Sequence, residues 1–119
     1  MNTTTTTPLA SIIMFVVASF FGALGQYLYK SGADAANSGL LSYLTNTRLM
    51  AGIACYVTVM VLFVAAFKRG GSMAALYPIY ATTFIWGAGI SHLAFGTEIR
   101  PVNIVGMAAI ISGMYLMGL

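Results

Sequence analysis

The feature that most constrains the fold is the spacing of the charged residues. Only seven of the 119 residues are Lys, Arg, Asp or Glu, and they leave four uncharged stretches at 9–29, 49–67, 72–96 and 102–119. A helix needs about 20 apolar residues to cross the hydrocarbon core of a bilayer, and each stretch comes close to that length. The sequence therefore predicts an all-α integral membrane protein with four transmembrane helices in one domain.

The composition excludes an ordinary water-soluble domain. Hydrophobic residues make up 60% of the chain and charged residues 6%, whereas soluble domains carry about 25% charged residues. The net charge of +3 comes from a few cations at the ends of the uncharged stretches, where lipid headgroups lie. We therefore expect membrane lipids as neighbours and no nucleic-acid partner.

The segments outside the predicted spans differ in character. Residues 1–8 (MNTTTTTP) have low complexity and are expected to form a disordered tail, followed by the transmembrane domain at 9–119. The connection at 30–48 is long, and its LLSYL stretch is expected to form a short helix at the membrane interface. The connection at 68–71 predicts a tight basic turn, and the one at 97–101 ends on a proline suited to the first turn of a helix.

Four short helices that pack on one another leave no route for a solute, so a transporting chain of this size is expected to act as a dimer. Its partner is a second copy or a paralogous small membrane subunit. Gly22, Gly106 and Gly113 are small residues that let membrane helices approach closely, either at a dimer seam or within one protomer. The loop charges on the two membrane faces differ by one cation, so the positive-inside rule fixes no orientation.

One face of the first predicted span carries a polar stripe. Ser19, Gly22, Gln26 and Lys30 follow one another at steps of three or four residues, which places them on the same face of a helix. An unpaired amide in hydrocarbon is costly, so Gln26 must face protein, water or a ligand. Two interpretations stay open: Gln26 bonds a neighbouring helix while Lys30 anchors the interface, or both side chains bind a ligand.

The third predicted span contains two tyrosines on either side of a proline. Pro78 removes a backbone donor, so we expect a kink or an open turn there. Tyr77 and Tyr80 would then line a cleft, with hydroxyls for polar groups and rings for apolar chains. The alternative is that both tyrosines belong to the aromatic belt at the membrane interface.

Ionisable side chains gather near the end of the third span. His92 lies about one turn before that end, and an intramembrane ionisable residue is a functional candidate by default. A lone histidine bonded to a neighbouring helix is the commoner case. Glu98 and Arg100 follow in the next connection, where Glu98 is expected to pair with Arg100 or Lys30, or to cap the fourth helix.

The four predicted spans contain no Asp or Glu. A proton-driven exporter of cations needs a membrane carboxylate that holds proton and substrate in turn. An anionic substrate fits better, because Lys30, aided by Arg100 or His92, can hold a phosphate while an apolar chain stays in lipid. The sequence contains no catalytic constellation, metal-ligand cluster or phosphate-binding glycine loop, so we expect neither an enzyme nor a metal or other cofactor.

Three segments together resemble one group of membrane transporters. They are GALGQYLYKSGA (22–33), ALYPIYATTFIWG (75–87) and FGTEIRPVNIVGMAAIISGMYLMG (95–118). In this order and spacing they resemble the drug/metabolite transporter superfamily at its small, four-helix end, which includes small-multidrug-resistance-like and EamA-type proteins. Within that group the chain looks most like the flippase subunits for aminoarabinose-linked undecaprenyl phosphate.

The resemblance implies a carrier that moves a polyprenyl-phosphate-linked sugar across the inner membrane, as a homodimer or as a pair of related subunits. Gln26 and Lys30 would meet the phosphate, with Glu98 and Arg100 at the same mouth, and the two tyrosines of the third span would line the path. Small multidrug exporters carry a glutamate eight residues before the lysine. This chain has Gly22 at that position, which departs from proton-coupled drug export.

Three functions therefore compete. The first is a flippase for a lipid-linked phosphate or sugar phosphate. The second is an exporter of small cationic amphipaths in the multidrug manner. The third is a non-transporting membrane subunit that stabilises a partner, in which Gln26 and Lys30 would be dispensable.

Overall fold

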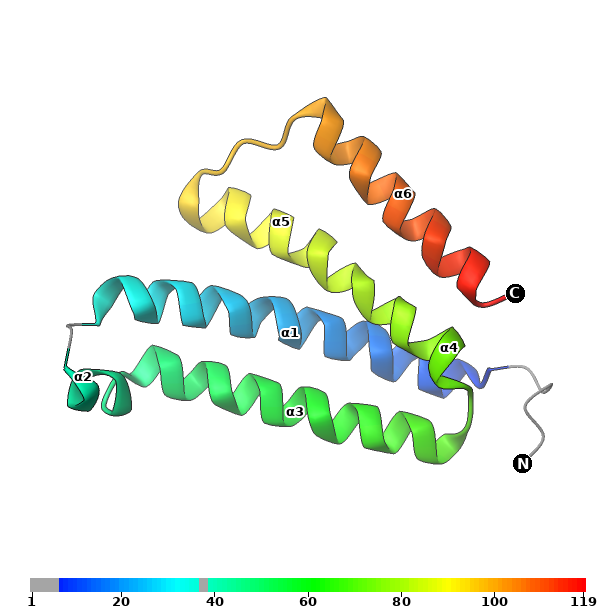
Figure 1. Ribbon diagram of the computed structural model, residues 1–119, viewed down its shortest axis with the longest axis horizontal. Coiled ribbons are helices and arrows are strands. Elements are labelled where there is room, and N and C mark those ends of the chain that lie inside the picture. Colours follow the sequence, from blue (N-terminus) through cyan, green and yellow to red (C-terminus); the bar gives the residue numbers. More distant parts are fainter. Residues whose placement is uncertain (1–6, 37–38) are drawn as a thin grey trace.

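The computed structural model describes residues 7–36 and 39–119, and this part of the chain folds into helices and their connections. The tail expected to be disordered, residues 1–8, lies for the most part outside the described residues. The helical elements, labelled in Figure 1, are α1 (Leu9–Ala35), α2 (Leu40–Leu44), α3 (Thr47–Arg69), α4 (Met73–Leu76), the 3₁₀ helix η1 (Tyr77–Ala81), α5 (Thr82–Phe95) and α6 (Pro101–Met117).

Three helical segments are long and apolar enough to cross a membrane. They are α1, α3 and the run from α4 to α5, at Leu9–Ala35, Thr47–Arg69 and Met73–Phe95. This finding supports an all-helical membrane protein and three of the four expected spans. The fourth span remains a prediction, because α6 is apolar but has only 17 residues. A helix of that length reaches about 26 Å, so it would need a locally thinned bilayer to cross.

Local signals in the sequence account for the ends of the first long helices. α1 continues past the predicted end of its span to Ala35, with Lys30 and Asp34 forming an ion pair one turn apart. Asn46 caps α3, because its Oδ1 accepts hydrogen bonds from two backbone N–H groups of the first turn at 3.0 and 3.2 Å. The LLSYL stretch forms α2, as expected.

The later connections also follow the sequence. Gly70 and Gly71 turn the chain after α3 with φ angles of 128° and 103°, a region that favours glycine, and this confirms the expected tight turn. Pro78 lies in η1, where the chain tightens into a 3₁₀ helix. Pro101 opens α6, and the Oδ1 of Asn103 accepts a hydrogen bond from the backbone N–H of Arg100 at 2.8 Å.

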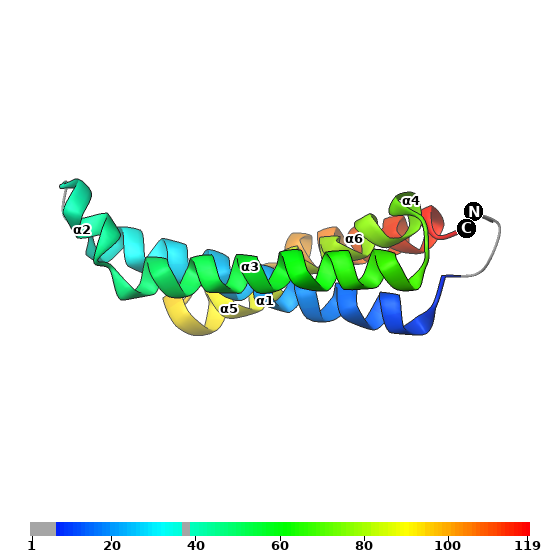
Figure 2. The same ribbon diagram turned by 90° about the horizontal axis from the view of Figure 1, so that it is seen from below.

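The four long helices lie in a flat layer. Their order across the layer is α3, α1, α5 and α6, so that α1 lies between α3 and α5 (Figure 1). Seen from its edge the layer is thin (Figure 2), and the overall extents are 51, 35 and 17 Å. The expectation that all four helices pack on one another is therefore wrong for this protomer, since α3 and α6 lie at opposite edges.

α1 and α3 pack closely because each helix offers glycines to tyrosine rings of the other. The ring of Tyr56 lies against Gly25 and the ring of Tyr29 against Gly52, so a Cβ at either glycine would stand 2.7 or 2.6 Å from a ring carbon. The two rings stack with their centroids 5.2 Å apart. Buried Ser11 donates to two backbone carbonyls at the end of α3, at 2.9 and 3.0 Å. These contacts fix the register of the pair.

α5 is attached to α1 through a buried serine. Ser19 Oγ accepts hydrogen bonds from the Thr82 hydroxyl at 2.6 Å and from the indole N–H of Trp86 at 3.1 Å. One turn further along α1, the hydroxyl of Tyr80 lies so close to Gly22 that a Cβ there would stand 2.0 Å from it. Gly22 therefore packs within the protomer.

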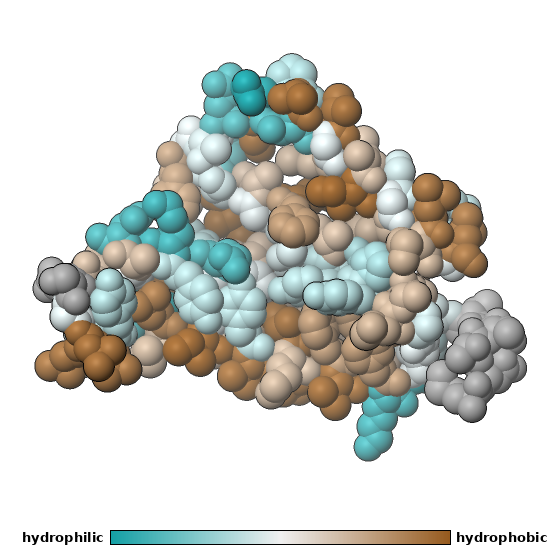
Figure 3. Space-filling model, viewed as in Figure 1, coloured by the Kyte–Doolittle hydropathy of each residue, from teal (hydrophilic) through white to brown (hydrophobic). Residues whose placement is uncertain are grey.

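α5 and α6 contain no buried residue among those the structure describes. A Cβ at Gly106 or Gly113 would meet nothing within 4 Å, so neither glycine of α6 packs against the rest of the described protomer. Figure 3 shows apolar colours along much of the helices, the strongest hydrophilic colour near their ends and a paler hydrophilic tint across the middle. Lipid or a second chain would have to cover such an apolar surface.

Candidate functional site

A groove runs between α1 and α5, and we term it the α1–α5 groove. It consists of two adjoining cavities of about 230 and about 570 Å³, which share Ala23, Gln26 and Gly87. The smaller cavity leads to Lys30 and Ser91 and is completed by Tyr27, Ile90 and Phe95. The larger cavity is completed by Tyr56, Tyr80, Thr83 and Phe84.

Gln26 stands at the junction of the two cavities. Its side-chain N–H donates to the Tyr56 hydroxyl at 2.5 Å, and that hydroxyl lies 3.3 Å from the carbonyl oxygen of Gly22. An amide offers two donor and two acceptor positions, and the bond to Tyr56 uses one donor. Gln26 remains an exposed residue in the middle of an apolar helix. It therefore both joins α1 to α3 and faces the groove.

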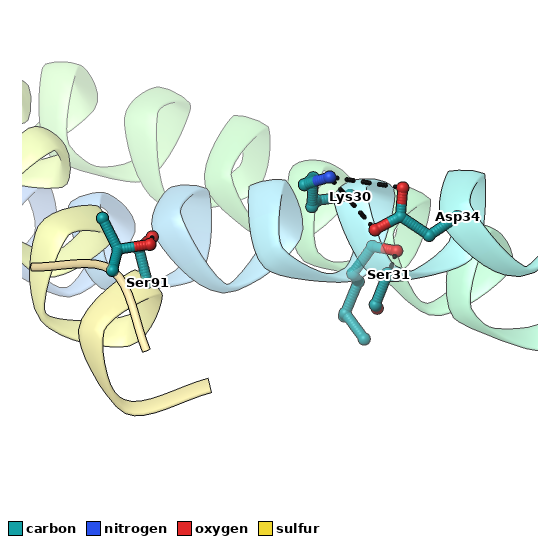
Figure 4. Close-up of polar contacts among 6 residues, drawn as sticks. Lys30, Ser31, Asp34 and Ser91 are labelled. Atoms are coloured by element: carbon teal, nitrogen blue, oxygen red, sulfur yellow. Dashed lines mark hydrogen bonds and ion pairs between the residues drawn. The ribbon is translucent and has the colours of Figure 1, made fainter. Parts of the chain in front are cut away.

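Lys30 lies at the polar end of the groove. Its Nζ is 3.1 Å from a carboxylate oxygen of Asp34, and the two side chains are 61% and 59% exposed (Figure 4). The same ammonium stands 5.8 Å from the centroid of the Phe95 ring on α5. Exposed ion pairs one helical turn apart contribute only about 0.3–0.5 kcal/mol, so an anionic ligand can take the place of Asp34.

Several groove residues escaped the sequence analysis, among them Tyr56 on α3 and Thr83 on α5. Tyr56 is the one tyrosine in the apolar stretch 49–67, and that isolation is the signal that could have drawn attention to it. Its partnership with Gln26 depends on how α1 and α3 pack, which no sequence pattern specifies. Thr83 gave no signal, because threonines are common in membrane helices.

Three of the seven predicted binding residues line the α1–α5 groove: Gln26, Lys30 and Tyr80. Tyr77 and His92 line neither cavity of this groove. The Tyr77 ring is 58% exposed and meets the Phe63 ring edge to face at 6.5 Å. The Nδ1 of His92 lies 2.8 Å from the backbone oxygen of Thr97, so this ring braces the turn that ends α5.

Glu98 and Arg100 border a different groove, between α5 and α6, which we term the α5–α6 groove. It has a volume of about 720 Å³ and shares Phe84 and Ser91 with the α1–α5 groove. Within this protomer Glu98 and Arg100 line a different groove from Lys30, and their common role at one mouth stays a prediction. Glu98 forms no ion pair with Lys30 or Arg100 among the described residues, and Lys30 pairs with Asp34 instead. The residue that caps α6 is Asn103 rather than Glu98.

The described residues contain no group of three or more His, Cys, Asp or Glu side chains that could hold a metal ion. Cys55 is a partly buried free thiol. What the site offers chemically is a graded groove, with one ammonium at its end and an amide and hydroxyls further in. These groups can hold a ligand through charge and hydrogen bonds.

Comparison of the chain with known protein families, with curated proteins and with solved structures gave no match.

Proposed function

We propose that this protein is a membrane carrier for a lipid-linked phosphate or sugar phosphate of the undecaprenyl-phosphate type. The observation that carries the proposal is the exposure of Gln26 and Lys30, one helical turn apart, in a groove on a helix apolar enough to cross a membrane. Polar and charged groups at such a position are costly and mark ligand paths in membrane proteins. A phosphate matches both side chains.

The phosphate would be held by three kinds of donor. The ammonium of Lys30 supplies the charge and the amide of Gln26 supplies an N–H. The hydroxyl of Ser91 lines the same cavity from α5; without ligand it donates to Thr97 Oγ1 at 2.7 Å, and it would turn toward the phosphate. Asp34 neutralises the ammonium of Lys30 in the absence of ligand, and the weakness of this exposed pair lets the phosphate displace the carboxylate.

The flat layer of helices supports a lipid-linked rather than a fully soluble cargo. The α1–α5 groove lies on an open face of the layer, so a ligand can keep its polyprenyl chain in the bilayer while the headgroup is in the groove. Aromatic and small residues line the groove beside the polar ones. A headgroup therefore enters sideways without drawing its tail out of the lipid.

We further propose that the carrier acts as a dimer in the inner membrane. A single layer leaves the groove open on one side, and the unburied surface of α6, with Gly106 and Gly113, offers small residues to a second chain. The partner is a second copy or a related small subunit. In a dimer, Glu98 and Arg100 of one protomer could approach the groove of the other.

A second candidate function is that of a non-transporting membrane subunit. The same unburied surfaces of α5 and α6 favour it, since they also suit a larger partner protein. Export of cationic amphipaths is less favoured, because the residues that line the α1–α5 groove include no carboxylate.

Native mass spectrometry of the purified protein during titration with undecaprenyl phosphate tests the proposal. We expect a dimer that retains the lipid, with binding weakened about tenfold or more in Lys30→Ala, because a charge-assisted hydrogen bond is lost. Lys68→Ala is the matched control, since Lys68 is an exposed lysine at the other end of the layer and outside the groove. Equal effects of the two substitutions would refute a specific phosphate site. A protein that binds no phosphate lipid would favour the subunit role.

A further inference from the structure

The deeper part of the α1–α5 groove differs chemically from its end. The cavity of about 570 Å³ is lined by Ala23, Gln26, Tyr56, Tyr80, Thr83, Phe84 and Gly87, and none of these side chains is charged at neutral pH. Cavities that hold small ligands usually measure about 300–1,000 Å³ and combine apolar walls with a few polar groups. This cavity fits that description, and Lys30 lies outside it.

The polar groups of the deeper cavity are one amide and three hydroxyls, from Gln26, Tyr56, Tyr80 and Thr83. Each of these groups both donates and accepts hydrogen bonds. A sugar hydroxyl has the same dual character, so it can pair with the donor and acceptor positions that the bonds from Gln26 to Tyr56 and from Tyr56 to Gly22 leave open. The exposed ring of Phe84 adds an apolar wall on which the C–H face of a sugar can pack.

A charged headgroup would bind less favourably in this cavity than a neutral one. An ammonium group would enter without a carboxylate to pair with, and a phosphate would enter without a cation. Both would lose their hydration at the depth of an apolar helix, where an unpaired charge is costly. The phosphate of a glycosyl phosphate therefore suits the end of the groove at Lys30, and its sugar suits the uncharged cavity.

We infer that the α1–α5 groove selects a lipid-linked phosphate that carries a neutral sugar, with the phosphate at Lys30 and the sugar among Gln26, Tyr56 and Thr83. This inference rests on the proposed function and narrows its substrate class. It excludes amino sugars as the preferred cargo. The cavity has space for a sugar because two of its lining residues, Ala23 and Gly87, are small; larger side chains at these positions would fill it.

Gly87 provides a direct test of the site. A Cβ at this position would meet nothing within 4 Å, although Gly87 lines both cavities. Gly87→Leu should therefore fill the groove without disturbing the helices. Gly89→Leu is the matched control, because Gly89 also has open space at its Cβ and lines neither cavity of the groove.

The experiment compares two probes that differ in one group. Undecaprenyl phosphate glucose and its 4-amino-4-deoxy analogue carry the same phosphodiester and the same chain, and only the second adds an ammonium. In native mass spectrometry with the full-length protein, we expect the glucosyl lipid to bind about tenfold or more tightly than the amino analogue. Gly87→Leu should abolish this preference and Gly89→Leu should keep it.

Thr83→Val supplies a variant that keeps the side-chain shape and removes one hydroxyl. It should weaken binding of the glucosyl lipid about threefold or more, because a donor and acceptor of the sugar pocket is lost. This variant keeps the test valid if Gly87→Leu fails to fold.

Each other result has a distinct meaning. If both lipids bind in a Lys30-dependent manner with equal affinity, or the amino analogue binds more tightly, the neutral-sugar inference is overturned and the carrier proposal stands. If the preference survives Gly87→Leu and Thr83→Val leaves binding of the glucosyl lipid unchanged, the assignment of the sugar to this cavity is overturned. If neither lipid binds in a Lys30-dependent manner, the carrier proposal itself fails.

Discussion

The contact between Gly22 and Tyr80 yields a prediction whose size can be worked out from the structure. In Gly22→Ala the new Cβ would stand 2.0 Å from the Tyr80 hydroxyl oxygen and 2.9 Å from Cζ of the same ring. Ordinary contacts begin near 3.4 Å, so the hydroxyl must withdraw by about 1.4 Å. The ring cannot bend, and its other side meets the Phe63 ring edge to face at 5.1 Å.

Overpacking of this kind costs about 1–3 kcal/mol in folding free energy. Replacing glycine by alanine within a helix also contributes about 1 kcal/mol of stability through helix propensity, which partly hides the clash. Gly106→Ala gains the same propensity term with open space around its Cβ. The difference between the two variants should therefore report the overpacking alone, with Gly22→Ala less stable than Gly106→Ala by about 1–3 kcal/mol.

Denaturant unfolding in detergent micelles can measure this difference through the chain's single tryptophan, Trp86, which lies at the same α1–α5 contact. In a Tyr80→Phe background the hydroxyl is gone, so the cost of Gly22→Ala should fall. The packing of Tyr80 on Gly22 is refuted if Gly22→Ala and Gly106→Ala unfold at the same denaturant concentration. An undiminished cost in the Tyr80→Phe background would assign the clash to another group.

Three further predictions concern other contacts. Ser11→Ala should cost about 1–3 kcal/mol, because the carbonyls of Ala66 and Gly70 lose the hydroxyl hydrogen that they share, and amide exchange at the end of α3 should speed up. Unchanged exchange would contradict this prediction. Asp34→Asn should tighten binding of undecaprenyl phosphate about twofold by releasing Lys30 from an exposed ion pair, and weaker binding in a titration would speak against displacement. Ser19→Ala should shift the emission of Trp86, whose indole N–H loses its acceptor, and an unchanged spectrum would show that this bond is not formed.

The sequence predicted only those site residues whose relative positions follow from the periodicity of a single helix. Gln26 and Lys30 are four residues apart, so helix periodicity alone puts them on one face. Tyr80 was identified through its proline neighbour. Glu98 and Arg100 were assigned to the same mouth as Lys30, but the structure puts α5 between them, so that they border another groove.

Tyr56 could not be found in this way. Its position opposite Gln26 depends on how closely α1 and α3 approach, and this approach is made possible by Gly25 and Gly52 together with the rings that lie against them. A pattern within one helix predicts the face that a residue occupies. It does not identify the residue that this side chain contacts on the neighbouring helix.

The sequence by itself determined the membrane character of this protein, its helices and their main boundaries. Spans free of charge can satisfy their backbone groups in lipid only by forming helices, and glycine, proline and asparagine mark where those helices begin and end. Only the tertiary structure decided that the helices form a flat layer, that α6 packs no glycine against its own chain, and that an uncharged cavity continues inward from Lys30. The physical reason is that apolar helices in lipid lack a hydrophobic force that orders them. Their arrangement follows from close contacts between individual side chains, such as Tyr80 on Gly22 and Trp86 on Ser19.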